Sequence, residues 1–442
     1  MKLKKLLISI LAIAMVFSLC AVPAMADTPA AAGNVIFIRD GAEGDGSSAD
    51  SPLKPTTGNY DATAERPELH KDAALYQAWQ KLMAAGGGTI VICGPYTLDN
   101  SNCQPIGGAS ADFKMGAVNH NPNITITYTS VWDGVDYRKT AGAELIMAGK
   151  SHLTFPTATI MENITVRATA DNGDHYIAAG LNSLTLSKGT NFIPYDETKV
   201  DSYPMILGSF RSNAGALKEG DSNIVIDIGD ENSIGNIFGM CNGGNGKHTG
   251  NTNITIKSGS VGGIYGDSRA TGQVPLQGDI NLNFEGGIYR GLIAGVNIGF
   301  SGGCDKVVNI KISGGDFSKC LGILPNTTAA DALMPAAVNV DCSGAPIETA
   351  RQVKDVASIL VNLTLPENYT DKDPEPTNTD STEPVESTPS ETKPVETTPG
   401  ETKPAVTDPD TQNGTPVWIP IVIAAAVAAV AAVAVIVVKK KK

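Results

Sequence analysis

Short runs of alternating hydrophobic and polar residues recur along the middle of the chain, and glycines follow each run. Asn223-Ile-Val-Ile and Asn253-Ile-Thr-Ile open the two clearest copies. Downstream of these runs, Ser233–Gly239 (SIGNIFG) recurs as Ser260–Gly266 (SVGGIYG). Alternation with a period of two is typical of a half-buried strand, and glycine permits sharp turns between strands. The pattern therefore predicts short strands joined by corners.

The repeat extends beyond these copies in both directions. Looser copies begin at Asp279 and Val308. Further strands are expected at Asn123–Tyr128, Glu144–Met147, Asn163–Val166, Ser183–Leu186, Pro204–Leu207, Ala337–Val340 and Ile359–Leu365. A repeat of about 20 to 30 residues leaves no room for helical crossovers, so the chain must coil on itself with successive turns paired in parallel. We predict an all-β fold, a parallel β-helix.

Asparagines recur at equivalent places of this repeat, at Asn223, Asn253 and Asn309. At the corners of a parallel coil, their side chains either stack and exchange amide hydrogen bonds or only favour the turn conformation. The sequence leaves both interpretations open. Two irregular stretches, Thr129–Lys139 and Asp171–Tyr176, are expected to protrude as loops.

The first 26 residues have the pattern of a secretory signal peptide. Three lysines precede an apolar run that ends at Leu19, and Ala24-Met-Ala26 fits a cleavage site. Cys20 raises the alternative of a lipoprotein, but Leu19 stands where a lipoprotein signal needs a small residue. Cleavage after Ala26 is therefore predicted.

The carboxyl-terminal part of the chain changes composition twice. Residues 366–416 are rich in Thr, Pro and Glu and nearly free of large apolar side chains, which predicts a disordered stalk. Residues 417–438 carry no charge and are long enough to cross a bilayer, and four lysines, 439–442, follow. The positive-inside rule places the tail in the cytoplasm and the body outside. We expect a single-pass cell-membrane protein with an extracellular ectodomain.

This order of stalk, apolar segment and basic tail resembles Gram-positive surface proteins. The sortase motif Leu-Pro-x-Thr-Gly is absent, and Asp410–Gly414 is its nearest analogue in position. Retention in the membrane is therefore expected rather than covalent attachment to the wall.

The start of the mature chain suggests a cap for the coil. Asn34–Arg39 predicts a strand, a Gly- and Asp-rich loop follows, and Asp72–Ala85 predicts a helix with one apolar face. The segment Gly87-Gly-Thr…Gly-Pro-Tyr96 comes next. This succession resembles the N-terminal cap of the pectate-lyase-like right-handed parallel β-helix superfamily. The resemblance implies that the helix covers the first turn of the coil, but not an activity, because this superfamily contains polysaccharide lyases, glycoside hydrolases, tailspikes and adhesins.

Together these features divide the chain into six parts. They are a signal peptide (1–26), a cap with the first turns (27–118), the β-helix repeats (119–365), the stalk (366–416), a transmembrane helix (417–438) and a basic tail (439–442).

The charge of the chain limits its partners. The part between signal peptide and tail holds 26 basic and 46 acidic residues, a net charge of −20. Such a surface argues against nucleic acid as a partner. It leaves room for extracellular or cell-wall glycans, for a host surface, and for an acidic glycan bridged by calcium.

Six cysteines remain after removal of the signal peptide, in no metal-ligand spacing. A Cys93–Cys103 disulfide is the first candidate for a bridge. The alternative, which we favour, is buried free thiols, with Cys304, Cys320 and Cys342 in the core on successive turns.

Catalytic candidates are few. A lyase of this fold needs a basic proton acceptor beside acids that hold calcium, and Asp267, Arg269 and Arg290 leave successive turns at similar places. The alternative is solvated corner charges, which the missing Arg-x-Pro-x-x-Arg and Trp-x-Asp-His elements favour. The Asn-Thr-Asp element of polygalacturonases occurs only at Asn378–Asp380, in the stalk. Catalytic residues therefore stay unassigned.

Two loops offer oxygen and nitrogen ligands for a metal. Asp171-Asn-Gly-Asp-His175 is either a metal loop or an ordinary polar loop, and Asp40–Asp45 is either a calcium loop or part of the cap geometry. The five histidines are scattered, so no zinc site is predicted. We predict no cofactor and leave calcium open.

Two functions fit this sequence. The favoured one is a bacterial surface-displayed, non-catalytic β-helix for adhesion or glycan binding. The alternative is a membrane-tethered polysaccharide lyase or glycoside hydrolase with an unfamiliar site.

Overall fold

A computed structural model describes most of the predicted cap and repeats. The described residues are 34–55, 73–98, 104–106, 110–114, 121–148, 150–169, 175–199, 202–209, 219–241, 249–267, 278–296, 306–326 and 335–371. The predicted signal peptide, transmembrane helix and basic tail, and all but the first residues of the predicted stalk, lie outside them. Within these ranges, none of the helices combines the length and the hydropathy that a membrane span requires.

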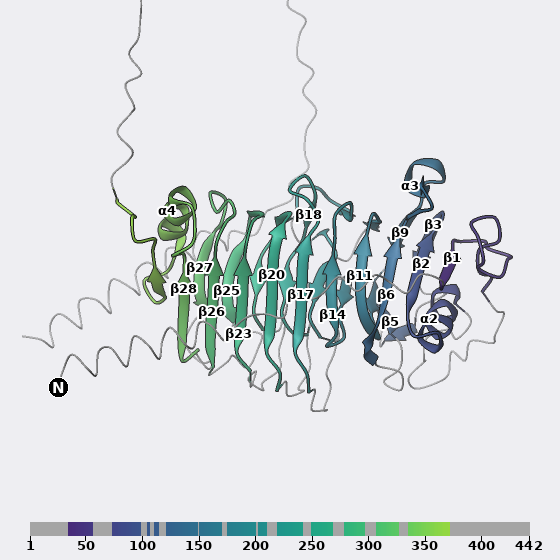
Figure 1. The fold of residues 1–442 in the computed structure, drawn as a ribbon, viewed down its shortest axis with the longest axis horizontal. Helices are drawn as coiled ribbons and strands as arrows, with labels where there is room; N and C mark the ends of the chain where they lie inside the picture. Colours follow the sequence, from purple (N-terminus) through teal and green to yellow (C-terminus); the bar gives the residue numbers. More distant parts are fainter. Residues whose placement is uncertain are drawn as a thin grey trace, which may run out of the picture. The chain divides into compact units, whose positions relative to one another are not determined.

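The described chain is mostly β, and its longest sheet has eleven strands. In sheet order these are β1 (Val35–Ile38), β2 (Gly88–Ile92), β6 (Asn121–Thr129), β11 (Thr157–Glu162), β14 (Ser183–Leu186), β17 (Ser222–Asp227), β20 (Thr252–Ser258), β23 (Ile280–Phe284), β26 (Val307–Ile312), β28 (Ala337–Asp341) and β29 (Asn362–Thr364). Figure 1 shows most of them side by side along the body.

A second sheet has nine strands, and the remaining strands form smaller sheets. The nine are β4 (Gln104–Ile106), β5 (Ser110–Lys114), β10 (Lys150–Thr154), β13 (Tyr176–Ala178), β16 (Met205–Leu207), β19 (Ile237–Phe238), β22 (Ile264–Tyr265), β25 (Leu292–Val296) and β27 (Gly322–Asn326). A four-stranded sheet holds β3 (Pro95–Leu98), β9 (Glu144–Met147), β12 (Thr165–Ala168) and β15 (Asn191–Ile193), and a three-stranded sheet holds β18 (Ser233–Ile234), β21 (Ser260–Val261) and β24 (Ile288–Tyr289).

The chain visits these sheets in rotation. It runs from β17 through β18 to β19, and then from β20 through β21 to β22. Each strand pairs in parallel with its counterpart one circuit later: β17 with β20, β18 with β21 and β19 with β22. We call one such circuit a rung. The expected coil of parallel strands is confirmed, and its long parallel sheets are consistent with a parallel β-helix or solenoid.

Alternation along each strand separates the core from the outer face. In β17, Ile224 and Ile226 are buried, whereas Asn223 and Val225 are half-buried. The parallel register places buried aliphatic residues of successive strands side by side. Ile254 of β20 pairs with Ile224 of β17 on one side and with Leu282 of β23 on the other. Each rung therefore adds one layer to a continuous apolar column.

Close approach of the backbone explains the glycines that end the strands of the nine-stranded sheet. A Cβ added at Gly239 would lie 2.3 Å from Cγ2 of Thr252 and 2.4 Å from the carbonyl oxygen of Gly266. Both distances are shorter than van der Waals contact. Gly239 lies at the corner between the nine-stranded and the eleven-stranded sheet. The chain can turn this tightly there only because glycine has no side chain.

The predicted cap helix is confirmed as α2 (Ala74–Ala84), at one end of the body in Figure 1. Its buried face includes Leu75, Trp79 and Leu82. The backbone N–H of Leu75 donates to the hydroxyl of Tyr96 at 3.1 Å, and the indole N–H of Trp79 donates to the hydroxyl of Tyr128. Both tyrosines belong to the first rungs, so these bonds attach the helix to the coil.

The other end of the body differs from the prediction. The helix α4 (Ile347–Val356) covers it, with Ala350 and Val353 buried in the core. The predicted strand Ile359–Leu365 is shorter than expected, since only β29 pairs with the sheet. Ile359 is 93% exposed, because the chain is still turning the corner there.

Two stretches near the start of the repeats were interpreted wrongly. The stretch Thr129–Lys139 was expected as an irregular loop. It instead contains an antiparallel hairpin of β7 (Val131–Trp132) and β8 (Val135–Asp136), followed by α3 (Tyr137–Thr140). Asp133 and Gly134 form its turn with φ of 49° and 77°, as a two-residue hairpin requires. Asn163 lies in a left-handed turn with φ of 49° before β12, not in the predicted strand.

Candidate functional site

Arg290, a predicted catalytic candidate, is engaged by the backbone of two preceding rungs. Its Nη2 donates to the carbonyl oxygens of Ile234 at 3.0 Å and Ser260 at 3.2 Å. The guanidinium carbon lies 5.7 Å from the ring centroid of Tyr203, a distance at which a cation is attracted to the ring. Arg290 therefore links four neighbouring rungs, which is a structural role.

The expected grouping of Arg290 with Asp267 does not occur. The register of β21 with β24 places Arg290 opposite Gly262, at the corner before β22. Asp267 lies past the other end of β22 and is only 2% exposed. Arg269 lies outside the described residues. Arg290 and Asp267 thus occupy similar places in the sequence repeat but lie at different corners of the coil.

The candidate metal loops give no ligand set in the part that the structure describes. His175 is buried, and its Nε2 lies 3.2 Å from the carbonyl oxygen of Thr169. Residues 171–174 lie outside the described ranges. No three His, Cys, Asp or Glu side chains of the described residues come together as a metal site would need.

The acidic cap loop uses its carboxylates within the protein. Asp40 accepts hydrogen bonds from the backbone N–H and the hydroxyl of Thr97, the latter at 2.7 Å. Asp45 Oδ1 accepts from both the N–H and the hydroxyl of Ser47 and from the hydroxyl of Ser51. These bonds lower the pKa of Asp45 to about 2. The carboxylates of Asp40 and Asp45 thus hold the cap loop in place through hydrogen bonds within the protein, as the interpretation as cap geometry expects.

The favoured free thiols are confirmed for Cys93, Cys320 and Cys342, all buried, and Cys241 is buried as well. The less favoured alternative, a Cys93–Cys103 disulfide, is not found, because the Cys93 thiol is free and donates to the carbonyl oxygen of Ile38. Cys103 and Cys304 lie outside the described residues. Burial raises the pKa of Cys320 to about 11 and that of Cys342 to about 12, so both thiols are protonated and weakly nucleophilic.

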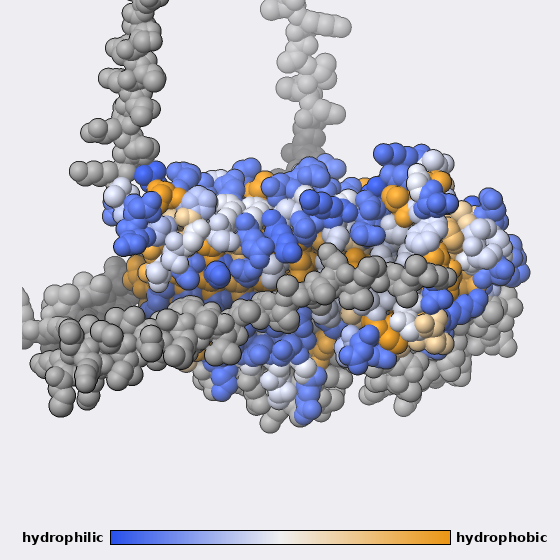
Figure 2. All heavy atoms as spheres, viewed as in Figure 1, coloured by the Kyte–Doolittle hydropathy of each residue, from blue (hydrophilic) through white to orange (hydrophobic). Residues whose placement is uncertain are grey.

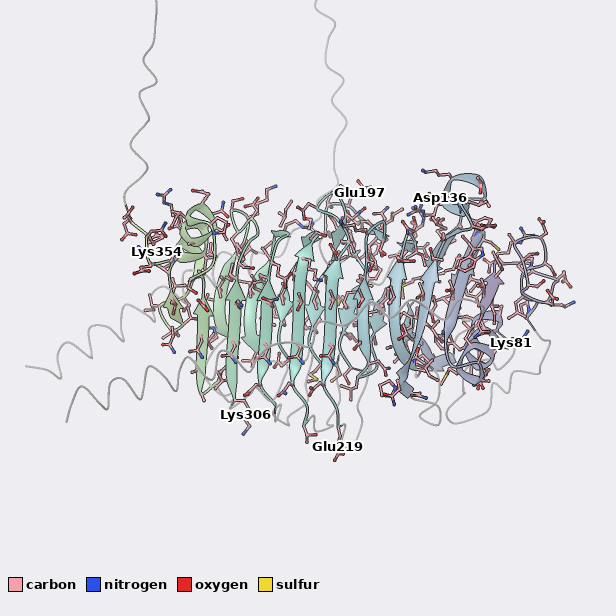
Figure 3. All side chains as sticks on the ribbon, viewed as in Figure 1. Lys81, Asp136, Glu197, Glu219, Lys306 and Lys354 are labelled. Carbon is pink, nitrogen blue, oxygen red and sulfur yellow. The ribbon has the colours of Figure 1, made fainter. Side chains whose placement is uncertain are left out.

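Charged side chains of the body are spread over its surface rather than gathered in one place. In Figure 3, Asp136, Glu197 and Lys354 lie along one edge, whereas Glu219 and Lys306 lie along the opposite edge.

One extended polar feature does span many rungs: a ladder of asparagines on the outer face of the eleven-stranded sheet. Each Nδ2 donates to Oδ1 of the asparagine one rung before it, at 3.0 to 3.2 Å. The members of this asparagine ladder are Asn223, Asn253, Asn281, Asn309, Asn339 and Asn362. Of the two interpretations that the sequence left open, amide exchange is the one observed, but the residues lie within strands rather than at corners.

Sequence reasoning found only half of this ladder. Asn281, Asn339 and Asn362 were missed because the residues that follow them differ from the pattern Asn-Ile-x-Ile. The signal that finds Asn281 and Asn339 is an asparagine between two buried aliphatic residues at the start of a strand, as in Ile280-Asn-Leu and Val338-Asn-Val.

A second polar column runs parallel to the ladder, two residues before the ladder asparagine and immediately before the strand begins. The Asp221 carboxylate accepts from the backbone N–H of Asn251 at 2.8 Å, and Asn251 Oδ1 accepts from the N–H of Asp279 at 2.9 Å. On the other side of the ladder lie Thr255 and Asn283. The outer face is thus a periodic polar surface, and hydrophilic residues also cover much of the face seen in Figure 2.

Comparison with family models, with curated proteins and with solved structures finds no match for the chain.

Proposed function

We propose that the protein is a bacterial cell-surface protein that binds glycans through the outer face of a right-handed, pectate-lyase-like parallel β-helix, without cleaving them. The asparagine ladder carries this proposal, because it is an extended polar surface built from rigid side chains. Preorganised polar groups of this kind bind a ligand at a low entropic cost.

The roles of the catalytic candidates support a non-catalytic protein. General acid–base catalysis needs a basic and an acidic group within reach of one bond. Arg290 instead donates to two backbone carbonyls, and Asp267 is buried beyond the next corner.

The ends of the sequence support display at the cell surface. The signal-peptide pattern of residues 1–26 directs export, and the apolar segment 417–438 with its basic tail would anchor the chain in the membrane. A stalk at 366–416 would hold the body away from the bilayer.

The test is to incubate the full-length protein in detergent with neutral and uronate-containing polysaccharides, with and without calcium. Binding and chain cleavage are measured on the same samples. We expect binding without cleavage. Calcium-dependent cleavage would overturn the proposal in favour of a tethered lyase, and calcium-independent cleavage in favour of a hydrolase.

A further inference from the structure

The asparagine ladder leaves regular hydrogen-bonding capacity unused. A primary amide has two N–H donors and an oxygen with two lone pairs. In an inner member such as Asn281, one N–H donates to Asn253 and one lone pair accepts from Asn309. The described residues supply no partner for the other N–H or the other lone pair. Each inner rung therefore offers one donor and one acceptor.

The spacing of these groups is fixed by the backbone. Neighbouring parallel strands lie ~4.8 Å apart, so six ladder residues span ~24 Å along the coil. The side chains from Asn223 to Asn339 are half-buried, and Asn362 is exposed. Because each amide is held by its neighbours, little rotamer entropy is lost when a ligand binds.

The charges beside the ladder select against anionic ligands. The ladder itself carries no formal charge. Asp221 and Asp279 lie in the column on one side, and Asp341 lies on the other side near Lys311. The whole chain has a net charge of −13, which repels uronates and phosphates.

We infer, on the basis of the proposed function, that the asparagine ladder is the binding surface itself and that its ligand is a neutral, unbranched polysaccharide aligned with the coil axis. Sugar hydroxyls both donate and accept hydrogen bonds. They can therefore pair with the free N–H and the free lone pair of each rung. A linear polymer repeats these hydroxyls at intervals close to the strand spacing, whereas a branched one cannot follow a straight row.

The experiment titrates the full-length protein in detergent with linear β-glucan oligosaccharides of increasing length, and in parallel with oligogalacturonates. Affinity is expected to rise with length until the oligomer spans the ladder, ~24 Å, and then to level off. Oligogalacturonates are expected to bind at least about tenfold more weakly. Stronger binding of the acidic oligomers, or no dependence on length, would overturn the inference.

Two variants locate the site. Asn283→Arg places a long side chain beside Asn281 without removing a ladder member, and we expect it to weaken glucan binding about tenfold. Glu219→Gln changes the net charge by the same amount at an exposed corner and is expected to bind like the wild type. If Asn283→Arg fails to fold, Thr364→Arg on the exposed last rung should shorten the usable ladder and lower the length at which affinity levels off.

The outcomes separate the two proposals. If the wild type binds no polysaccharide at all, the proposed function fails and the inference fails with it. If glucans bind but the folded Asn283→Arg or Thr364→Arg variant binds them as the wild type does, the ladder is only structural and the proposed function stands.

Discussion

Asn281 donates its side-chain amide to Oδ1 of Asn253 at 3.0 Å, across 28 residues of chain. The bond exists because parallel register places every rung in line with the one before it. Neighbouring rungs are therefore held together by side-chain hydrogen bonds on the outer face as well as by apolar packing in the core.

Removing an inner member should weaken that coupling. Asn281→Ala deletes two side-chain hydrogen bonds and is expected to lower the free energy of unfolding by about 1 to 2 kcal/mol. Urea unfolding measures the change. Asn283→Ala is the matched control on the same face of β23, where the side chain donates a hydrogen bond to exposed Glu285; a loss below about 0.5 kcal/mol is expected. Equal losses in both variants would contradict a specific role of the ladder.

The cap should depend on the buried bond between Trp79 and Tyr128. Tyr128→Phe removes the hydroxyl that accepts the buried indole N–H of Trp79, which is expected to cost about 1 to 3 kcal/mol of unfolding free energy. In a Trp79→Phe background the same substitution should cost clearly less, since no N–H remains to be orphaned. Additive effects in this double-mutant cycle would show that the bond contributes nothing.

Arg290 should matter for stability and not for chemistry. Arg290→Met keeps the aliphatic stem but removes the donor to Ile234 and Ser260, so we expect a loss of about 2 to 3 kcal/mol in urea unfolding. Lys319→Met, at an exposed lysine, should change stability by less than about 0.5 kcal/mol. A stable Arg290→Met variant would refute the structural role.

The buried thiol of Cys342 predicts a specific loss of stability at alkaline pH. Burial raises its pKa to about 12 from the usual 9.0. Since the folded state binds the thiol proton more tightly than the unfolded state, stability is retained below pH 9 and falls as the pH rises toward 12. Cys342→Ala should flatten this part of the stability–pH curve relative to the wild type. An unchanged slope would mean that the thiol is accessible to water in the folded state.

The cap loop predicts the opposite behaviour in acid. Hydrogen bonds from Ser47 and Ser51 lower the pKa of Asp45 to about 2 from 3.8. Its contribution to stability is therefore present above about pH 4 and is lost as the pH falls toward 2. Asp45→Asn should lower the melting temperature at neutral pH and have no effect near pH 2. A constant difference across this range would assign the effect to something other than the carboxylate charge.

Local patterns were sufficient for much of the fold. The alternation in Asn253-Ile-Thr-Ile places Ile254 and Ile256 in the core, as observed, because side-chain direction in a strand depends only on odd or even position. The apolar stripe of residues 72–85 likewise predicted the cap helix, which is observed at Ala74–Ala84.

Other features could not be predicted in this way. The helix α4 lies between the last two expected strands, where no element was predicted. It covers the end of the coil, and the need for such a cover arises only once the last rung is in place. The hairpin of residues 131–136 is a different case: it was missed although its turn, Asp133-Gly134, is a strong local signal for a two-residue hairpin.

What the sequence determined by itself is the coil: strand periodicity, corner glycines and a repeat too short for crossovers leave a chain no other way to bury its apolar face. What only the tertiary structure decided is which residues of different rungs meet. Register set Arg290 and Asp267 at separate corners and brought six asparagines into one line. Hydrogen bonding between residues some 30 positions apart depends on that register, and no local pattern specifies it.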